Sequence, residues 1–210
     1  ELQQKYILAC QSQPKSDVRV EVDFERMADL PDHKLQTSTA SIKEKNRLTK
    51  DIIELIVETD KIIEFTPGQY AEISVPGRFA EPRAYSFASA GRMNPKELNF
   101  FIRAVPNGEV SNWFVHEAAV GEKIQVEGPS GDFHLRESDA PMVCIAGGSG
   151  LAPVLALLED AIHKSVDRDL IMFFGARTEQ DLYALDRIEH LRKKWAGDFK
   201  FIPVLSDEAA

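Results

Sequence analysis

The chain has 210 residues, a length that suits two small domains better than one. Hydrophobic residues make up 43% of it and charged residues 28%, as in a globular protein with a sizeable core. The formal net charge of −9 argues against a nucleic acid partner. No apolar run reaches the roughly 18 residues of a membrane span. With only two cysteines as well, we expect a cytoplasmic protein with no membrane partner.

The chain opens with a short apolar run, a turn at Pro14 and an alternating strand, within YILACQSQPKSDVRVEV. Residues 24–35 follow and have the polar composition of a linker. The sequence starts at Glu1 without a methionine and ends in LSDEAA. We therefore expect the natural protein to be longer at both ends.

Residues 36–138 contain six strand-like segments separated by Gly and Pro, which predicts a small antiparallel barrel or sandwich. One short helix, Glu109–Ala118, is expected before the last strand. The expected strands are Thr39–Lys45, Ile52–Glu58, Tyr70–Val75, Ala84–Ala88, Leu98–Ala104 and Lys123–Glu127.

The pattern changes in residues 139–210, where continuous apolar strands alternate with helices. Such a pattern predicts a parallel sheet covered on both faces, as in an α/β domain. Strands are expected at 141–147, 169–176 and 199–205, and helices at 148–164 and 181–195.

The segment GGSGLAP, Gly147–Pro153, joins an apolar strand to a helix. Glycines let a phosphate approach the backbone, and the helix start offers N–H groups and a positive dipole end. The spacing differs from the usual GxGxxG dinucleotide pattern, and a tight turn without a ligand is the alternative.

Two stretches of the expected barrel contain polar residues that the formation of a strand does not require. In RAYS, Arg83 can donate paired hydrogen bonds to a pyrophosphate, Tyr85 can cover a flat ring, and Ser86 can donate to a ring atom. In FFIRAVPNGEVS, the helix start and Ser111 can form a second phosphate cradle. The alternatives are a solvated edge strand and a plain helix cap.

Taken together, the ordered motifs PGQY, RAYS, FIRAVPNGEVS, EGPSGDF, CIAGGSGLAP and FFGAR resemble the ferredoxin–NADP reductase superfamily over about residues 36–205. The resemblance implies an antiparallel barrel that binds FAD, followed by an α/β domain that binds NADH or NADPH. Hydride would pass from the nicotinamide to the flavin, and electrons would then leave singly.

The resemblance also assigns residues. Arg83 would hold the FAD pyrophosphate, Tyr85 would stack on the flavin ring, and Ser86 and Ser149 would act as catalytic hydroxyls, Ser86 near flavin N5. The diphosphate, the ribityl chain and the nicotinamide would be lined by further residues of these motifs. They are Ala84, Phe101, Ile102, Arg103, Val105, Gly108, Val110, Ser111, Gly148, Gly150 and Arg177.

Residues 1–23 resemble the end of a plant-type [2Fe–2S] ferredoxin domain, in which Cys10 would be the fourth iron ligand. A lone buried cysteine is the alternative. A ferredoxin domain before an FAD barrel is typical of reductase components of bacterial multicomponent mono- and dioxygenases, such as those that act on phenol, toluene, methane or benzoate. Many of these serve aromatic hydrocarbon catabolism. The partner would be an oxygenase component or its ferredoxin. Three cluster cysteines and a CGPP-like turn of the family are absent, so the α/β domain is expected to be incomplete.

Arg177 follows the second strand of the α/β domain, where an arginine can bind the 2′-phosphate of NADPH. A solvated arginine is the alternative, and the oxygenase reductases favour NADH. Glu179 and Asp181 are candidates for the ribose hydroxyls. The histidines His116, His134, His163 and His190 show no spacing for a metal, and we expect none.

Two other functions remain open. A reductase for sugar deoxygenation also joins a ferredoxin domain to this flavin unit. A flavin-binding electron-transfer subunit that never meets nicotinamide is the other, although the GGSGLAP segment speaks against it.

Overall fold

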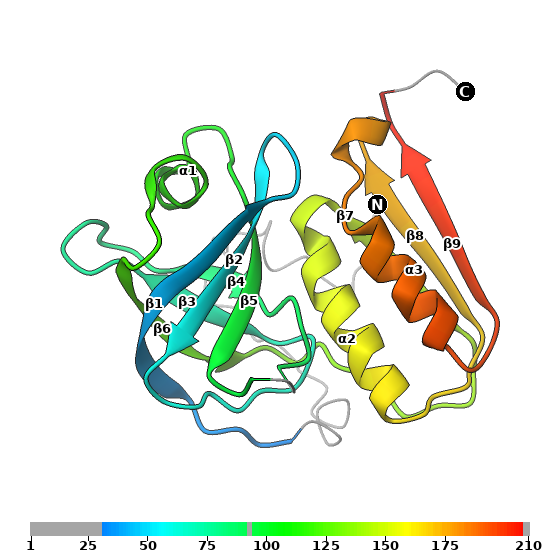
Figure 1. Cartoon of the computed structure of the whole chain (residues 1–210). Helices are drawn as coiled ribbons and strands as arrows, with labels where there is room; N and C mark the ends of the chain where they lie inside the picture. Colours follow the sequence, from blue (N-terminus) through cyan, green and yellow to red (C-terminus); the bar gives the residue numbers. More distant parts are fainter. Residues whose placement is uncertain (1–30, 92–93, 208–210) are drawn as a thin grey trace, which may run out of the picture.

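The structure is a computed structural model, and it describes residues 31–91 and 94–207. Figure 1 shows two halves side by side, a barrel followed by a sheet with two long helices. The expected ferredoxin-like segment with Cys10 lies outside the described residues.

Six strands form the first half, in the spatial order β4-β3-β6-β1-β2-β5, and each pairs antiparallel with its neighbours. The outer strands β4 and β5 meet through an antiparallel bridge between Phe87 and Phe100, which closes the sheet into a barrel. The expected six-stranded antiparallel barrel is confirmed. The strands are β1 (Gln36–Arg47), β2 (Ile52–Thr59), β3 (Tyr70–Ser74), β4 (Arg83–Ser86), β5 (Glu97–Arg103) and β6 (Lys123–Ser130).

Strand alternation decides which side chains face the neighbouring half. In β5, Leu98, Phe100 and Ile102 belong to the core inside the barrel. Phe101 has the opposite parity and belongs to a second core outside the barrel wall. Arg103 shares the parity of Phe101, so the same alternation brings a guanidinium to the outer side of the wall.

The expected helix after β5 is present and consists of two consecutive helical segments of different type. Helix α1 (Glu109–Asn112) continues into a π-helical turn, Trp113–Glu117. Trp113 and Phe114 are buried in the barrel core. This segment therefore closes one part of the barrel with aromatic side chains.

The second half is a three-stranded parallel sheet in the order β7-β8-β9, as expected. A 3₁₀ turn, Gly148–Gly150, leads into α2, and a second one, Glu179–Asp181, precedes α3. The long elements are β7 (Met142–Gly147), α2 (Leu151–His163), β8 (Leu170–Ala176), α3 (Leu185–Lys194) and β9 (Phe199–Leu205).

Both helices of this half lie on the same face of the sheet (Figure 1). Connections of one hand between strands that advance in one direction place their helices on one side. On the other face, Val143 and Ile145 are 62% and 76% exposed. The expected cover on both faces is thus wrong for the described residues, although the strands themselves were found.

Helix α3 begins four residues later than the sequence pattern predicts. Ala184, its N-cap residue, has φ of 55°, a left-handed conformation that breaks the helix from the 3₁₀ turn before it. The apolar residues Leu182 and Tyr183 pack in the core instead of starting the helix. Periodicity alone could not show that interruption.

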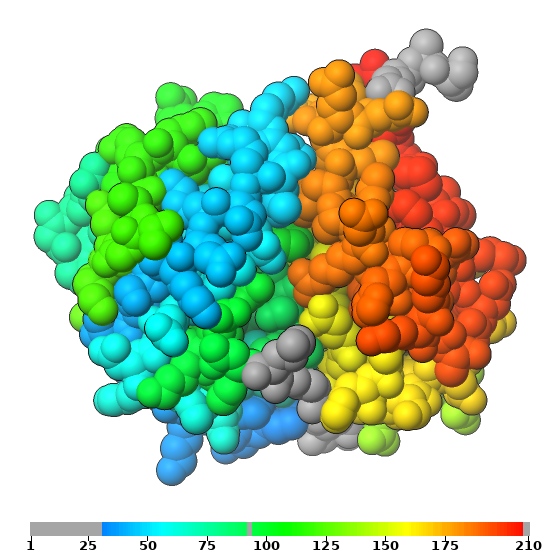
Figure 2. Space-filling view, in the orientation of Figure 1, coloured from blue at the N-terminus to red at the C-terminus, as the bar shows by residue number. Residues whose placement is uncertain are grey.

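The two halves share a buried apolar cluster. Ile52, Ala88 and Phe101 of the barrel belong to the same cluster as Leu151 and Phe174 of the α/β half. Figure 2 shows the resulting seam, where the cyan turn between β1 and β2 lies against the orange segment before α3. In residues 31–91 and 94–207, no helix has the length and apolar character to cross a membrane.

Candidate functional site

A cavity of about 350 Å³ lies at the seam, at the carboxyl ends of the parallel strands. Ligands of open α/β sheets bind at such strand ends. The cavity takes its walls from both halves of the molecule. Its lining includes Asp51, Arg103, Gly147, Gly148, Gly175 and Arg177.

An ion cluster joins the two halves at this cavity. Asp51, in the turn between β1 and β2, accepts from Nε of Arg103 at 3.0 Å and from Nη2 of Arg177 at 3.2 Å on the same oxygen. Arg177 also pairs with Asp181 at 3.3 Å. Lys50 adds a weaker contact to Asp181 at 3.6 Å. Two arginines are thereby held in the cavity by carboxylates.

The cluster shifts the ionisation of both carboxyls. Burial by itself raises the pKa of Asp51, but hydrogen bonds from Arg103 and Thr49 and the nearby arginine charges outweigh burial, so this pKa is lowered. For Asp181, burial is likewise outweighed by Arg177, Lys50 and Thr178, and the pKa is lowered. Both carboxylates are therefore ionised at neutral pH.

Two glycines that line the cavity, Gly147 and Gly175, and a third in the turn after β7, Gly150, have no structural need to be glycine. A Cβ on Gly147 would lie 3.9 Å from the nearest neighbour, one on Gly175 would lie 3.6 Å away, and one on Gly150 would meet nothing within 4 Å. None of the three has a positive φ. Because these glycines have no side chain, a ligand has room to pass close to the backbone.

Gly148 differs from these three, because its φ of 52° favours glycine. Its carbonyl accepts a hydrogen bond of 2.8 Å from the hydroxyl of Tyr183. A Cβ there would lie 3.2 Å from a terminal nitrogen of Arg103. The glycine turn of the α/β half and the end of β5 thus meet at Gly148 and Arg103, while Ser149 is half-buried beside them.

The RAYS segment forms β4, the outer strand that pairs only with β3 and bridges to β5. Arg83 is exposed and donates to the carbonyl oxygen of Pro82 at 2.8 Å. Tyr85 is half-buried with its ring edge-on to Phe114, 6.1 Å between centroids. Burial raises the pKa of Tyr85 to about 12, against the opposing charge of Arg83. Ala84 is exposed, and Ser86 lies opposite Tyr70 in β3.

The loop from Val105 to Ser111 is held by its own hydrogen bonds. The hydroxyl of Ser111 donates to the carbonyl of Gly108 at 3.3 Å and accepts from the N–H of Val105 at 3.4 Å. A Cβ on Gly108 would lie within 2.6 Å of both side chains, so glycine is required there. No side chain caps the start of α1 at Gly108, which leaves its first N–H groups available.

Other candidate residues have buried side chains. Phe101, Ile102 and Val110 lie in the apolar cores, so only their backbone is open to a ligand. Ser111 is nearly buried as well. Among the described residues, Arg103, Gly148 and Arg177 come together at one cavity, whereas Arg83 and Tyr85 lie toward the α1 side of the barrel.

Several residues that shape this region carried no signal in the sequence. Asp51 is a single acidic residue in a polar turn, and Tyr183 is one aromatic residue among several apolar ones. Both were missed, because only the folded chain brings the turn after β1 and the segment before α3 to the same cavity. In the described ranges, no group of three or more His, Cys, Asp or Glu residues is placed to hold a metal ion.

Two groups of residues offer donors and open space of the kind that a dinucleotide requires. The exposed Arg83, the half-buried Tyr85 ring and the uncapped start of α1 suit a flavin dinucleotide along the barrel. The ordinary-φ glycines and the two arginines of the cavity suit a second dinucleotide.

Comparisons with known proteins agree with this geometry. The family described as "Oxidoreductase FAD-binding domain" matches residues 39–135, and the family "Oxidoreductase NAD-binding domain" matches residues 144–210. A xylene/toluene monooxygenase electron transfer component of Pseudomonas putida is 42% identical over 99% of this chain and 58% of its own length. The reductase subunit of an aromatic O-demethylase from Amycolatopsis is 36% identical over 96% of this chain and 60% of its own.

Solved structures show the same arrangement. A cytochrome P450 reductase of Amycolatopsis has a TM-score of 0.79 and 34% identity, over 87% of this chain and 56% of the other. The ferredoxin reductase in carbazole 1,9a-dioxygenase has a TM-score of 0.74 and 28% identity, over 84% and 52%.

The chain thus spans about three fifths of the length of the curated relatives described above. Its barrel and its three-stranded sheet coincide with the two matched domain families in the same order. The chain thus carries the FAD-binding and NAD-binding domains of oxidoreductases, and over these domains it is similar to reductase components of oxygenase systems.

Proposed function

We propose that this chain binds FAD along β4 and α1 and binds NADH in the cavity at the seam. The protein would transfer a hydride from NADH to the flavin and pass electrons singly through a [2Fe–2S] centre to an oxygenase component or its ferredoxin. One observation carries the proposal. Gly147 and Gly175 line the cavity although neither packing nor backbone conformation requires glycine there.

On the flavin side, three of the four residues of β4 have separate tasks. Arg83, exposed at the start of the strand, donates charge-assisted hydrogen bonds to the pyrophosphate. Tyr85 offers a ring face, and its raised pKa keeps the phenol neutral across the physiological range. Ser86 donates its hydroxyl proton near flavin N5. Val105, Gly108 and the start of α1 hold the diphosphate and ribityl chain.

On the nicotinamide side, the turn Gly148–Gly150 lets the dinucleotide approach the backbone, with Ser149 as the hydroxyl group that orients it. Arg103 stands over Gly148 and offers a positive charge where the two dinucleotides meet. The flavin, when bound, supplies the chemistry of accepting two electrons and releasing them one at a time. The protein contributes position and charge.

The ion pairs of Arg177 support NADH rather than NADPH as the reductant. Arg177 is our candidate for binding a 2′-phosphate, and it is already shared between Asp51 and Asp181. A 2′-phosphate would also have to approach these two carboxylates. The unphosphorylated ribose of NADH meets no such charge repulsion.

The names of the relatives support the remaining parts of the proposal. A naphthalene 1,2-dioxygenase/salicylate 5-hydroxylase reductase component of Ralstonia, described as a ferredoxin--NAD(P)(+) reductase, is 33% identical over 90% of this chain. We assign residues 1–23 to the end of a ferredoxin domain with Cys10 as a cluster ligand, and residues 24–35 to a linker. We likewise assign residues 36–138 to the FAD domain and residues 139–210 to the NAD domain. We propose that the protein is cytoplasmic.

Equilibrium binding tests this proposal. The purified chain is titrated into FAD and followed by flavin fluorescence, and NAD⁺ is then titrated into the loaded chain by calorimetry. We expect one FAD per chain and one NAD⁺ per loaded chain. The Gly175→Ala variant should bind FAD as the unmodified chain does and bind NAD⁺ less tightly. An unmodified chain that leaves flavin fluorescence unchanged would contradict the proposal.

A further inference from the structure

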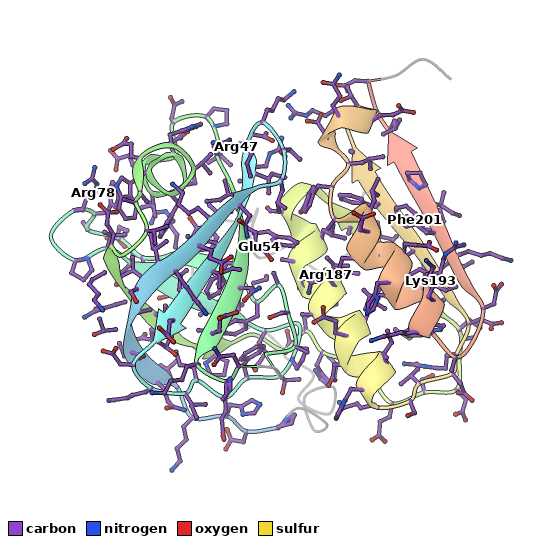
Figure 3. All side chains as sticks on the ribbon, viewed as in Figure 1. Arg47, Glu54, Arg78, Arg187, Lys193 and Phe201 are labelled. Carbon is purple, nitrogen blue, oxygen red and sulfur yellow. The ribbon has the colours of Figure 1, made fainter. Side chains whose placement is uncertain are left out.

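A second group of polar contacts lies at the seam, away from the ion cluster of Asp51. It is built on an ion pair within the α/β half. Arg187 of α3 pairs with Glu159 of α2, with 2.9 Å from Nε and 2.6 Å from Nη2 to the same carboxylate oxygen. Figure 3 labels Arg187 on the side of α3 that faces α2. Both side chains are about three quarters shielded from solvent, with 24% and 29% exposed.

This pair also contacts the barrel, at the segment that follows β4. Nη2 of Arg187 donates to the carbonyl oxygen of Ala88 at 2.5 Å. The second carboxylate oxygen of Glu159 accepts from the N–H of Ala90 at 2.9 Å. The α/β half thus donates one hydrogen bond to the barrel, from Arg187, and accepts one from the barrel, at Glu159. We call these four residues the β4 clamp.

The clamp acts on the segment that follows β4, where Phe87 also donates from its N–H to the carbonyl oxygen of Gln69 at 3.1 Å and bridges to Phe100. β4 has four residues and pairs along its length only with β3. Ala88 also donates from its N–H to the carbonyl oxygen of Asn99 at 2.7 Å. The clamp therefore fixes the remaining polar group of Ala88, which lies two residues, at most about 7 Å, from Ser86.

From this geometry we propose that Arg187 and Glu159 are positioning residues for the flavin. They hold the segment that follows β4 against α2 and α3, and through it they position the side chains of Arg83, Tyr85 and Ser86. The inference rests on the proposed function, because it assumes that β4 binds FAD. The NAD-binding half would then take part in binding FAD without a side chain touching it.

A purely structural role makes a different prediction. If the ion pair served only to hold α2 against α3, or the two halves together by charge, either orientation of the pair would do. The clamp requires the arginine on α3 and the glutamate on α2. Exchanging them would place an arginine donor against the N–H of Ala90 and a carboxylate acceptor against the carbonyl of Ala88.

The test compares five variants of the 210-residue chain by FAD titration, with the visible circular dichroism of the bound flavin as a second readout. Arg187→Ala and Glu159→Ala remove one arm each and should raise the Kd for FAD about tenfold, a loss of about 1.4 kcal/mol. Glu159→Gln keeps an acceptor for Ala90 and should stay within about threefold. The charge exchange, Glu159→Arg with Arg187→Glu, should bind FAD as weakly as Arg187→Ala.

Arg192→Ala is the matched control, because Arg192 lies on the same helix and pairs with Glu189 at the surface. It should leave the Kd for FAD and the dichroism unchanged. Thermal unfolding of the flavin-free variants checks that each of them folds, and variants that unfold like the unmodified chain carry the comparison.

Two results would overturn the inference. In one, Arg187→Ala and Glu159→Ala bind FAD with unaltered affinity and dichroism. In the other, the charge exchange restores the affinity of the unmodified chain. An unmodified chain that binds no FAD would instead refute the proposed function. The two failures are therefore distinct.

Discussion

Asp51 of the barrel and Arg177 of the α/β half are 126 residues apart in sequence and share a hydrogen bond of 3.2 Å. The same carboxylate oxygen accepts from Arg103, which stands over the glycine turn after β7. One carboxylate therefore places a cation from each half at the cavity between them. The behaviour of this cavity follows from that arrangement.

Asp51 should stabilise the fold in a pH-dependent manner. Its pKa is lowered in the folded state, so its contribution is complete above the unfolded value of about 3.9 and is lost as the pH falls through the lower folded value. We expect Asp51→Asn to lower the free energy of unfolding by about 1 kcal/mol at neutral pH. Urea unfolding should show this difference shrink as the pH is lowered below about 3.9. A difference that stays constant throughout the acid titration would contradict the role of charge.

Gly175→Ala should impair dinucleotide binding without harming the fold. The added methyl group would lie 3.6 Å from the carbonyl oxygen of Ala146, an ordinary contact, and Gly175 lines the cavity. The Kd for NAD⁺ should rise by about tenfold, while the midpoint of urea unfolding stays the same. Gly197→Ala serves as the opposite control. Its Cβ would lie 2.3 Å from a backbone oxygen, so that variant should lose stability instead.

Releasing Arg177 from its carboxylates should relax the choice of nucleotide. In the Asp181→Asn variant, Arg177 keeps one partner, Asp51, and a repulsive charge is removed. We expect the affinity for 2′-phospho-AMP to rise relative to AMP by about tenfold, measured by calorimetry. Arg177→Ala should abolish that gain when it is combined with Asp181→Asn. An unchanged ratio in Asp181→Asn would show that these ion pairs do not decide between NADH and NADPH.

Tyr85 should affect the flavin through its ring rather than through its hydroxyl. The ring packs edge-on against Phe114, and burial keeps the phenol protonated, with a pKa of about 12. Tyr85→Phe should therefore quench flavin fluorescence as the unmodified chain does, whereas Tyr85→Ala should quench it less. FAD binding should also show no titration of Tyr85 below about pH 10. Equal quenching by the alanine variant would exclude stacking.

The sequence predicted the barrel and the parallel strands because their signals are local. Alternation in ELNFFIR and the continuous run in LIMFFGA follow from which faces are buried. The two dinucleotide sites were instead implied by the family resemblance of the RAYS and GGSGLAP motifs. The strand patterns need no knowledge of distant contacts.

The remaining features depend on the assembled chain. Asp51 and Glu159 are ordinary acidic residues until folding brings them to Arg177 and to Ala90. The left-handed Ala184 interrupts a helical pattern that reads as continuous. Ile145 lies on an uncovered face of the sheet because both strand connections cross on the opposite face. Apolar runs in the sequence do not indicate on which face the connections cross.

The most direct test of a shared flavin and nicotinamide site is anaerobic mixing of the FAD-loaded chain with NADH. If the cavity at Arg103 and Gly148 brings the nicotinamide to the flavin on β4, the long-wavelength absorption band of the flavin will bleach. The Gly175→Ala variant will then need more NADH for the same rate. A loaded chain that binds NADH and keeps its full flavin absorbance would contradict the account.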